Sequence, residues 1–459
     1  MKQNLILCTD SYKASHYLQY PEGTSQVFSY IESRGGRYDK TVFFGLQAYL
    51  REYLEGVVIT QEMIDEADEF FKGHGEPFNR EGWEYIVREH GGRLPLEIKA
   101  VREGTAVPVK NILVSVTNTD PNCAWLPSYI ETTILRGVWY STTVATRSNS
   151  IRNTIKRFLE TTGDVTGLDF KLHDFGARGV SSGESGALGG MAHLVNFNGT
   201  DTIEGILAAK RYYDEPMAGF SIPAAEHSTM TMLGEEGEIE QFRRMIRCFA
   251  KPGSLFAVVS DGYDIMAACD KWGALRDEVI ASGAMLVVRP DSGDPVRMSL
   301  DVIRRLERHY GSTVNDKGFK VLNNVRVIYG DGINELTVES ILLSLEYARY
   351  SADNIAFGMG GGLLQQLDRD TQKFAMKASA AQIDGRWVDV FKDPVSDRGK
   401  TSKRGRMSLF RNTMNGELMT LRTDQGPVAE EWADEMVVVF RDGALMNQQT
   451  FAEIRSRVR

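Results

Sequence analysis

The sequence lacks the features that mark secreted, membrane-embedded and nucleic-acid-binding proteins. Its 459 residues include only four cysteines, scattered without a CxxC pair or metal-ligand spacing, which indicates a reducing compartment rather than a disulfide framework. No apolar run approaches the roughly 20 residues of a membrane span, and the one near the N-terminus is too short for a signal peptide. The net charge of −9 offers no basic excess for nucleic acid. We expect a cytoplasmic protein that binds neither membrane nor nucleic acid.

What the sequence does contain is a repeated pattern between residues 170 and 362, in which seven apolar runs each lead into a polar or glycine-rich cluster. Successive clusters are 26 to 40 residues apart, the length of a strand, a loop and a covering helix in a βαβ unit. Their markers are Asp174, Asp201, His227, Asp261, Asp291, Asp331 and Gly358. In a closed parallel barrel the carboxyl ends of all strands meet at one rim, where active sites are built. The pattern therefore predicts an irregular TIM-like α/β barrel, over residues 166–362, in an enzyme.

The flanking segments, residues 1–165 and 363–459, do not follow this spacing. Strands are expected near residues 5–8, 27–32, 96–107, 111–117, 374–382, 386–391 and 436–440, and helices near residues 42–54, 61–72, 80–89 and 144–161. A mixed composition at both ends, with no long linker, favours one discontinuous α+β domain built from both chain ends. The predicted class is thus α/β, with a barrel domain and this second domain.

The sharpest local motif is Arg-Pro-Asp-Ser-Gly at residues 289–293. Arg289 offers a planar fork for phosphate oxygens, and Asp291 can bind a ribose diol or a magnesium ion. A plain arginine–aspartate pair at a helix cap is the alternative. Gly330 and Gly361 lie in glycine-rich strand ends, where the backbone can approach a phosphate or ribose closely, although such runs also make simple turns.

Histidine and aromatic residues at other strand ends add further candidates. His227 can act as an acid, a base or a phosphoryl acceptor, with Asp261 orienting it, although a histidine is more often structural. Phe175 supplies a flat ring or, alternatively, ordinary core packing. The remaining histidines include His173, a second rim candidate, and three expected to be solvated, namely His74, His90 and His309.

Short motifs along the whole chain carry a specific resemblance. They are TDSYK at 9–13, LHDFG at 172–176, RGVSS at 178–182, HLVNF at 193–197, GTD at 199–201, PAAEHS at 223–228, RPDSG at 289–293 and FKDPV at 391–395. Together they resemble the nicotinamide phosphoribosyltransferases of the nicotinate/nicotinamide phosphoribosyltransferase family, nearly end to end. The resemblance implies a type II phosphoribosyltransferase fold and a homodimer with shared active sites. It also implies transfer from 5-phosphoribosyl-1-pyrophosphate to nicotinamide in NAD salvage, yielding nicotinamide mononucleotide and pyrophosphate.

The resemblance also implies roles for individual residues. Phe175 and Tyr12 of the partner subunit would stack on the two faces of the nicotinamide ring, and Asp201 would accept a hydrogen bond from its carboxamide. Arg178 and Arg289 would hold the pyrophosphate. Asp291, Gly330, Asp331, Gly361 and Arg369 would surround the nucleotide, and Lys377, Lys392 and Lys400 would reach its phosphates across the dimer. Mg²⁺ would be held mainly by substrate phosphates, and ATP would phosphorylate His227 as a stimulating co-substrate.

Two departures from the family pattern affect the expected pocket. Ala375 stands where related enzymes carry a phosphate-binding serine, and Ala177 replaces a tyrosine near the pocket mouth. Two alternatives remain open at this level: a nicotinate phosphoribosyltransferase, and a non-catalytic interaction protein on the same fold. Asp201 favours nicotinamide over nicotinate as the acceptor, since nicotinic acid would place its carboxylate against that of Asp201. An inactive descendant would be expected to lose charged rim residues, and the principal ones are all present.

Overall fold

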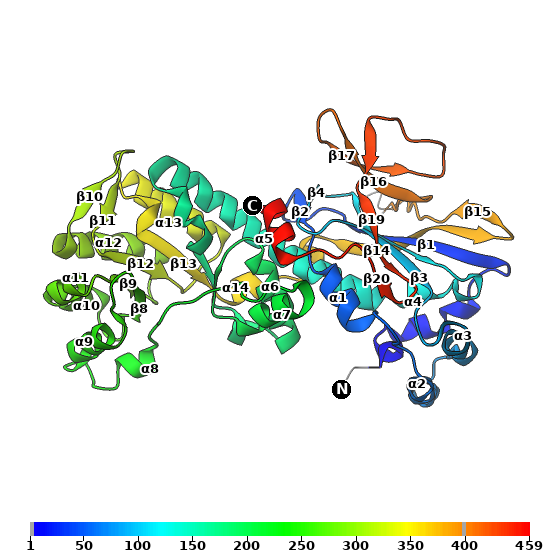
Figure 1. Ribbon diagram of the computed structural model, residues 1–459, viewed down its shortest axis with the longest axis horizontal. Coiled ribbons are helices and arrows are strands. Elements are labelled where there is room, and N and C mark those ends of the chain that lie inside the picture. The colour runs from blue at the N-terminus through cyan, green and yellow to red at the C-terminus, as the bar shows by residue number, and fades with distance from the viewer. Residues whose placement is uncertain (1–3, 397–400) are drawn as a thin grey trace. The chain divides into compact units, whose positions relative to one another are not determined.

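The computed structural model describes residues 4–396 and 401–459, so Lys400 lies outside the described residues. The chain forms two compact units (Figure 1). The barrel unit comprises residues 147–210 and 216–366; the sheet unit comprises residues up to 146, residues 211–215 and residues from 367 onward. The first division falls inside helix α5, Glu131–Thr162. The limits predicted for the two domains, at residues 165 and 363, stay a prediction.

The barrel unit is built on a six-stranded parallel sheet with the strand order β7-β6-β13-β12-β9-β8. The strands are β6 (Leu172–Asp174), β7 (Gly199–Thr200), β8 (Leu255–Val259), β9 (Met285–Arg289), β12 (Val325–Tyr329) and β13 (Ile355–Met359). Apart from the exposed Leu255, most of their apolar residues are buried, as expected for parallel strands covered by helices.

An extended segment at residues 220–225 bridges the two edges of this sheet. On one side the N–H of Thr200 donates to the carbonyl oxygen of Phe220 over 3.0 Å. On the other side the N–H of Ala225 donates to the carbonyl oxygen of Ala257 over 3.0 Å. The seven predicted segments therefore follow one another around an irregular barrel, and the predicted fold class is confirmed.

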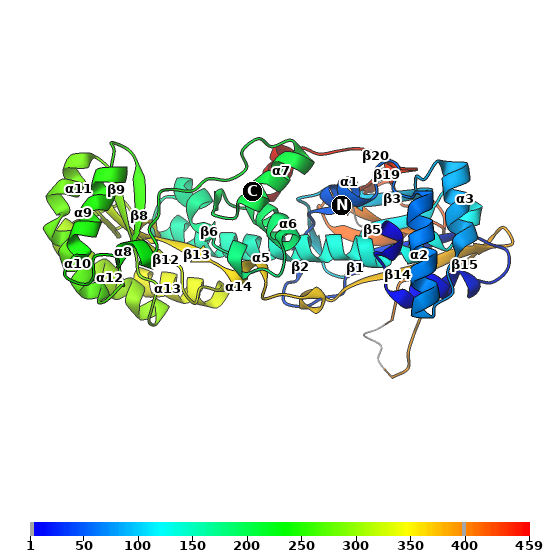
Figure 2. The same ribbon diagram turned by 90° about the horizontal axis from the view of Figure 1, so that it is seen from below.

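Helices follow the strands and cover the outside of the barrel unit (Figures 1 and 2). They are α6 (Gly183–Leu194), α7 (Ile203–Tyr213), α8 (His227–Met230), α9 (Glu238–Phe249), α10 (Ile265–Ala274), α11 (Arg276–Ser282), α12 (Pro295–Tyr310), α13 (Glu335–Tyr347) and α14 (Gly361–Leu364). Helix α12 shows why they form: Asp294 caps its N-terminus, Pro295 occupies the first turn, and Val302, Ile303 and Leu306 are buried at helical spacing.

The sheet unit contains a seven-stranded antiparallel sheet with the order β15-β14-β1-β5-β3-β19-β20. The strands are β1 (Thr24–Ser33), β3 (Leu96–Val101), β5 (Ile112–Asn118), β14 (Phe374–Ile383), β15 (Arg386–Asp389), β19 (Met436–Arg441) and β20 (Ala444–Leu445). Strands from both ends of the chain thus share one sheet, because β1 pairs with β14 and β3 pairs with β19.

Short helices and two small sheets complete the sheet unit. Helices α2 and α3 pack side by side (Figure 2) and each ends at a glycine with positive φ. The helices are α1 (Leu46–Tyr53), α2 (Gln61–His74), α3 (Arg80–His90), α4 (Leu126–Tyr129) and α15 (Phe451–Val458). The small sheets pair β2 (Lys40–Val42) with β4 (Ala106–Pro108), and β16 (Met407–Asn412) with β17 (Leu418–Arg422) and β18 (Trp432–Asp434).

The local predictions fail where a capping side chain or a glycine overrides the apolar pattern. The strand expected at residues 5–8 is wrong, because Leu5–Leu7 form a 3₁₀ turn. The N–H of Ile6 donates to the side chain of Asn4, which caps this turn. The helix expected from residue 42 begins only at Leu46, after Gly45 with φ of 99°.

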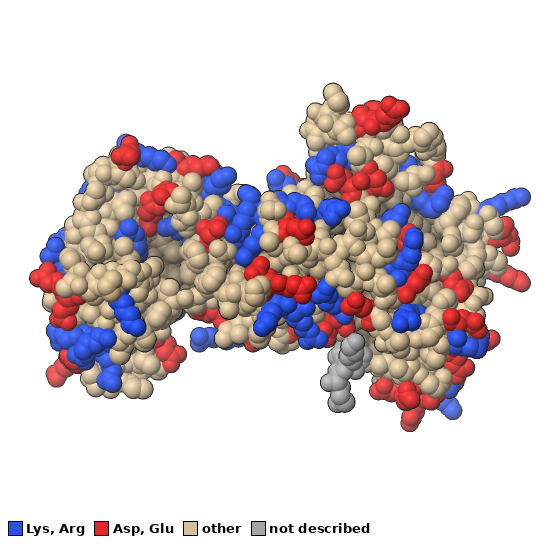
Figure 3. Space-filling view, viewed as in Figure 1, with Lys and Arg blue, Asp and Glu red and all other residues tan. Residues whose placement is uncertain are grey.

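Surface charge and helix apolarity are the two remaining features of the fold. On the face shown in Figure 3, acidic and basic side chains are interspersed over each unit. Within residues 4–396 and 401–459, none of the helices combines the length and apolarity needed to cross a membrane.

Candidate active site

Asp261, after the end of β8, is the centre of a hydrogen-bond network at the rim of the barrel. It accepts from Nε2 of His227 over 2.9 Å, from the N–H of Asp291 over 3.1 Å and from the hydroxyl of Ser292 over 2.5 Å. Burial works to raise the pKa of Asp261, but these donors outweigh it and hold the pKa below its usual value. The carboxylate is therefore ionised and joins three successive strand ends.

His227 is placed for access to a ligand. It is the first residue of α8, and its side chain is 46% exposed, whereas that of Asp261 is 5% exposed. Asp261 fixes the ring through Nε2, which orients the other nitrogen away from the carboxylate. The arrangement gives an exposed imidazole that is held by a buried charge.

Arg289, the last residue of β9, lies between Asp291 and Phe175. Its guanidinium donates twice to Asp291, through Nε over 3.1 Å and through Nη2 over 2.7 Å. Its Cζ atom lies 5.4 Å from the centre of the Phe175 ring. The arginine is thus fixed in direction but still partly exposed, at 25% of its side chain. The arginine–aspartate pair that the sequence offered as the alternative to phosphate binding is therefore present. It still leaves Arg289 at the rim of the barrel.

Phe175 rests on glycine at two strand ends. A β-carbon on Gly358 would lie 2.0 Å from Cε2 of the ring, so no larger residue fits beneath it. A β-carbon on Gly330 would lie 3.4 Å from the same ring atom. The partly buried ring also packs on the barrel interior, whose apolar cluster contains Ala257, Val287 and Ile328 with Ile222 and Ala356 beside them. The ring therefore forms the apolar floor of the rim.

Asp201 is an exposed carboxylate directly after β7. Its Oδ1 accepts a hydrogen bond from the hydroxyl of Ser221 over 2.5 Å, and its N–H donates to the carbonyl of Asp174 over 2.9 Å. Asp174 itself is fully buried, and its Oδ1 accepts from the N–H of Gly176 over 2.7 Å. Burial raises the pKa of Asp174 to about 6. A buried carboxyl group thus supports the loop that presents the exposed one.

The other rim loops are held by backbone contacts. The hydroxyl of Tyr329 donates to the carbonyls of Ser292 and Gly293, over 2.8 and 3.2 Å. Burial raises the pKa of Tyr329 to about 12, with added effects from the nearby carboxylates of Asp331, Asp261, Asp291 and Asp294. The tyrosine is therefore a neutral donor that fixes the loop after β9.

Arg178 is exposed in a 3₁₀ turn, Ala177–Gly179, after β6. This turn touches the start of α14, because a β-carbon on Gly179 would lie 3.3 Å from Cα of Gly361. The turn that carries Arg178 and the glycine-rich end of β13 therefore face one another.

Several predicted residues belong to the sheet unit. Lys13 ion-pairs with Glu131 over 2.8 Å, and its Nζ lies 5.4 Å from the ring of Tyr12, which is 56% exposed. Lys377 lies 4.0 Å from Glu131, and its pKa is lowered by burial and by the charges of Arg34, Lys13 and Lys392, against the effect of Glu131. Glu131 thus links Lys377 to Lys13, the chain neighbour of Tyr12, and the charge of the exposed Lys392 acts on Lys377. Arg369 is exposed and pairs with Asp370 over 3.0 Å.

The histidine predictions need correction. His90, expected to be solvated, has a side chain only 25% exposed and bonds to Asp120 over 2.8 Å. His309 bonds to Asp270 over 2.7 Å. The half-buried ring of His173 lies 3.1 Å from the carbonyl of Phe170, and burial lowers its pKa, which favours the neutral ring.

Ser221 and Tyr329 were missed by sequence reasoning. Ser221 follows the strand-like Phe220, and its role depends on a bridge to β7 that no local pattern reveals. Tyr329 ends a predicted strand next to Gly330. A polar hydroxyl at the end of an apolar run was the only sequence signal that it could bond to a neighbouring rim loop.

Solved structures share this architecture. A nicotinate-nucleotide pyrophosphorylase from Pyrococcus furiosus superposes with a TM-score of 0.63 at 15% identity, covering 100% of this chain and 95% of the other. A human nicotinic acid phosphoribosyltransferase superposes with a TM-score of 0.58 at 16% identity, covering 98% and 93%. The fold is therefore that of the type II phosphoribosyltransferases.

The chain belongs to the nicotinate phosphoribosyltransferase family, whose model matches residues 170–443, while a model of the nicotinamide phosphoribosyltransferase N-terminal domain matches residues 4–98. A nicotinamide phosphoribosyltransferase of Xanthomonas campestris pv. campestris is 52% identical, with 99% of this chain and 97% of the relative covered. One from Acinetobacter baylyi is 34% identical at the same coverage. The predicted family is confirmed, and the chain is a phosphoribosyltransferase of NAD biosynthesis.

Proposed function

We propose that the chain transfers the phosphoribosyl group of 5-phosphoribosyl-1-pyrophosphate to nicotinamide. The observation that carries this choice of acceptor is Asp201, an exposed rim carboxylate oriented by Ser221. A carboxylate accepts the N–H of a carboxamide but repels the carboxylate of nicotinic acid. The naming of the relatives at 52% and 34% identity agrees with this acceptor.

Phe175 supports the same acceptor, because a flat and partly buried ring suits a pyridine. The resemblance adds Tyr12 of the partner subunit on the opposite face. Ala177 has only a methyl group in the exposed turn beside Phe175, where related enzymes carry a tyrosine. We therefore expect the mouth of the pocket to be wider here than in those enzymes.

The phosphates would be held by positive charge and by backbone. Arg289 ends β9 and Arg178 follows β6, with β13 and β12 between these two strands. Both arginines would bind the pyrophosphate, with Gly330, Asp331 and Gly361 around the ribose and its 5-phosphate. In the reaction the nicotinamide nitrogen bonds to C1 of the ribose while the bond from C1 to the pyrophosphate oxygen breaks. The arginines stabilise the negative charge that accumulates on the leaving group, and the bound geometry supplies the positioning.

Magnesium fits this site as a companion of the phosphates. Among the residues that the structure describes, the barrel rim holds no cluster of three convergent histidine, cysteine or carboxylate ligands. The carboxylates of Asp291 and Asp331 would therefore share the ion with substrate phosphate oxygens, the hard ligands that Mg²⁺ prefers. When bound, the ion would neutralise charge on the pyrophosphate.

His227 would accept a phosphoryl group from ATP. Because Nε2 bonds to Asp261, Nδ1 is the nitrogen available for the new bond. The buried charge of Asp261 would stabilise the ring as it becomes positive. We expect His227→Ala to retain measurable transfer but to lose stimulation by ATP.

The sheet unit supports a shared site in a homodimer. Lys377, which the resemblance assigns to the partner's site, lies 4.0 Å from Glu131. Tyr12 lies beside Lys13, which pairs with the same carboxylate, and the charge of Lys392 acts on Lys377. A cluster of cations that share one carboxylate retains net positive charge for a phosphate. Arg369 would contribute from its own exposed position, and Ala375 would leave one phosphate contact unmade.

A product assay tests the proposed acceptor. Purified protein, Mg²⁺ and 5-phosphoribosyl-1-pyrophosphate are given nicotinamide or nicotinate, with and without ATP, and the mononucleotides are separated by chromatography. We expect nicotinamide mononucleotide as the main product, and a shift toward nicotinate in Asp201→Ser. Nicotinate mononucleotide from the unmodified protein would overturn the role of Asp201, while neither product would favour a non-catalytic role.

A further inference from the structure

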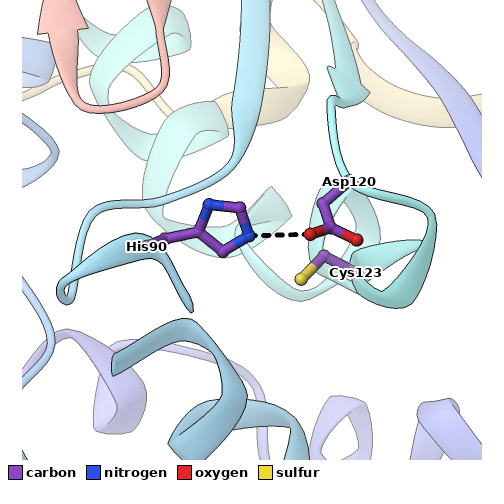
Figure 4. A group of neighbouring side chains, drawn as sticks. All are labelled: His90, Asp120 and Cys123. Atoms are coloured by element: carbon purple, nitrogen blue, oxygen red, sulfur yellow. Dashed lines mark hydrogen bonds and ion pairs between the residues drawn. The ribbon is translucent and has the colours of Figure 1, made fainter. Parts of the chain in front are cut away.

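Three potential metal ligands converge in the sheet unit, outside every residue assigned to the reaction (Figure 4). His90 ends α3, Asp120 precedes a 3₁₀ turn, and Cys123 ends that turn, Pro121–Cys123. One ligand atom from each lies within 4.8 Å of the other two. Over residues 4–396 and 401–459 this is the one such group of three.

Hydrogen bonds hold the side chains of Asp120 and His90 in place. Asp120 caps the turn, accepting from the N–H of Asn122 over 2.8 Å. It also accepts from the hydroxyl of Tyr85 over 3.0 Å. Nε2 of His90 lies 2.8 Å from Oδ2 of the same carboxylate, as the dashed line in Figure 4 shows. Gly91, with φ of 58°, ends α3 directly after the histidine.

We propose that His90, Asp120 and Cys123 form a structural site for a zinc-class divalent cation, with water as the fourth ligand. An imidazole nitrogen, a carboxylate oxygen and a thiolate sulfur are the donors that Zn²⁺ takes in proteins. Such a mixed set is unsuited to Mg²⁺, which prefers oxygen ligands throughout. The site is therefore chemically distinct from the proposed magnesium position at the barrel rim.

The distances require only a small rearrangement. Bonds of about 2.0 to 2.3 Å to a tetrahedral zinc place neighbouring ligand atoms roughly 3.3 to 3.7 Å apart. The pair formed by His90 and Asp120, now at 2.8 Å, must open by roughly half an ångström, and the farthest atoms, at most 4.8 Å apart, must approach by about one. Since the side chains of His90 and Asp120 are 25% and 16% exposed, they can move and admit an ion from solvent.

The apolar core surrounds Cys123, and hydrogen bonds from neighbouring side chains support Asp120. Cys123 is completely buried, so its sulfur is shielded from oxidants and anchored by the core. Tyr85 and Asn122 hold the Asp120 carboxylate from outside, as supporting hydrogen bonds do for metal ligands. Binding displaces the thiol proton of Cys123, and any proton on Nε2 of His90, into solvent.

The bound ion would join two segments that are distant in the sequence, the end of α3 and the turn after β5. A cation that binds only the folded chain raises the unfolding temperature as its concentration rises above the dissociation constant. The expected consequence is stability of the sheet unit, with no part in phosphoribosyl transfer.

Cobalt(II) and zinc binding to the full-length protein test this site. The protein is stripped with a chelator and dialysed, then titrated with Co²⁺ while its absorption is recorded. We expect one equivalent to bind with a sulfur-to-cobalt charge-transfer band and the strong visible absorption of tetrahedral cobalt. Zn²⁺ should displace it and raise the unfolding temperature by several degrees.

Matched variants identify the ligands. His90→Gln and Cys123→Ser should each weaken Zn²⁺ binding at least tenfold, measured against a chromogenic chelator, and Cys123→Ser should abolish the charge-transfer band. His74→Gln, in the neighbouring helix, and Cys248→Ser, an exposed cysteine, should change neither. If Cys123→Ser does not fold, the cobalt spectrum of the unmodified protein and His90→Gln decide the matter. Absence of the charge-transfer band, or equal Zn²⁺ affinity in His90→Gln, would reduce the group to a plain histidine–aspartate hydrogen bond.

Discussion

Substitution of alanine for Gly358 tests whether the position of the Phe175 ring determines nicotinamide binding. The new β-carbon would lie 2.0, 2.2 and 2.8 Å from Cε2, Cδ2 and Cζ of the ring. Non-bonded carbon atoms stay about 3.5 to 4.0 Å apart, so the ring must retreat by roughly 1.5 Å. The backbone at Gly358 lies outside the left-handed region, and alanine adds no conformational strain there. The three nearest contacts of the new β-carbon are therefore all with the ring.

The expected effect is selective for one substrate. A displacement of about 1 Å in a positioning group can cost about 100-fold, so we expect kcat/KM for nicotinamide to fall by about 10- to 100-fold. The KM for 5-phosphoribosyl-1-pyrophosphate should change by less than about twofold, because the arginines remain in place. Steady-state kinetics with each substrate varied in turn give both values. Overpacking should also lower the unfolding free energy by about 1 to 3 kcal/mol, which thermal unfolding monitors.

Gly183→Ala is the matched control. Gly183 is the first residue of α6 in the same unit, and no atom lies within 4 Å of the β-carbon position. This variant should have unchanged kinetics. A folded Gly358→Ala enzyme with normal kcat/KM for nicotinamide would refute the stacking role of Phe175, and an equal loss for both substrates would point to general disruption instead.

Three further experiments test other parts of the site. In Asp261→Asn, loss of a charged hydrogen bond worth about 1.5 to 3 kcal/mol should lower labelling of His227 by radioactive ATP about 10- to 100-fold; undiminished labelling would exclude the pair. The unfolding free energies of the unmodified protein and of Asp174→Asn are compared at several pH values. Because the pKa of Asp174 is raised to about 6, its stabilising contribution is present below about pH 4 and is lost as pH rises through 6. The unfolding free energy of the unmodified protein, relative to the variant, should therefore fall by about 2 kcal/mol between pH 4 and 7 in urea titrations, and a constant difference would contradict this. Mixing inactive Tyr12→Ala and Asp201→Ala chains should restore activity if sites are shared, and mixed dimers without activity would argue against it.

The barrel was predictable because its signal is repeated. Seven apolar runs at similar spacing specify parallel strands, and parallel strands place their carboxyl ends at one rim whatever the detailed packing. Asp174, Asp201, Asp261 and Asp291 could therefore be assigned to that rim from their positions after apolar runs. Single short segments carried much less information. Residues 5–8 are as apolar as a strand, yet a side-chain cap from Asn4 makes them a helical turn.

The partners within the rim could not be predicted, because hydrogen bonds depend on which loops meet. Ser221 reaches Asp201 only because residues 220–225 bridge β7 and β8, and Ser292 reaches Asp261 only because β9 pairs with β8. Phe175 needs glycine at residue 358 because β13 pairs directly with β6. Each contact is a property of strand order, which local patterns leave open. Strand order thus turns a set of plausible residues into a defined network.

The group formed by His90, Asp120 and Cys123 also could not be predicted from local sequence patterns. Its two halves are separated by 30 residues, and neither half has the spacing of a known zinc motif, so the cysteines seemed unrelated to metal. The end of α3 and the turn after β5 meet only in the folded sheet unit, where Trp83, Trp125 and Tyr129 pack edge to face between the same two segments. Apolar packing therefore brings the ligands together, and a cation bound there would reinforce a contact that the core already makes.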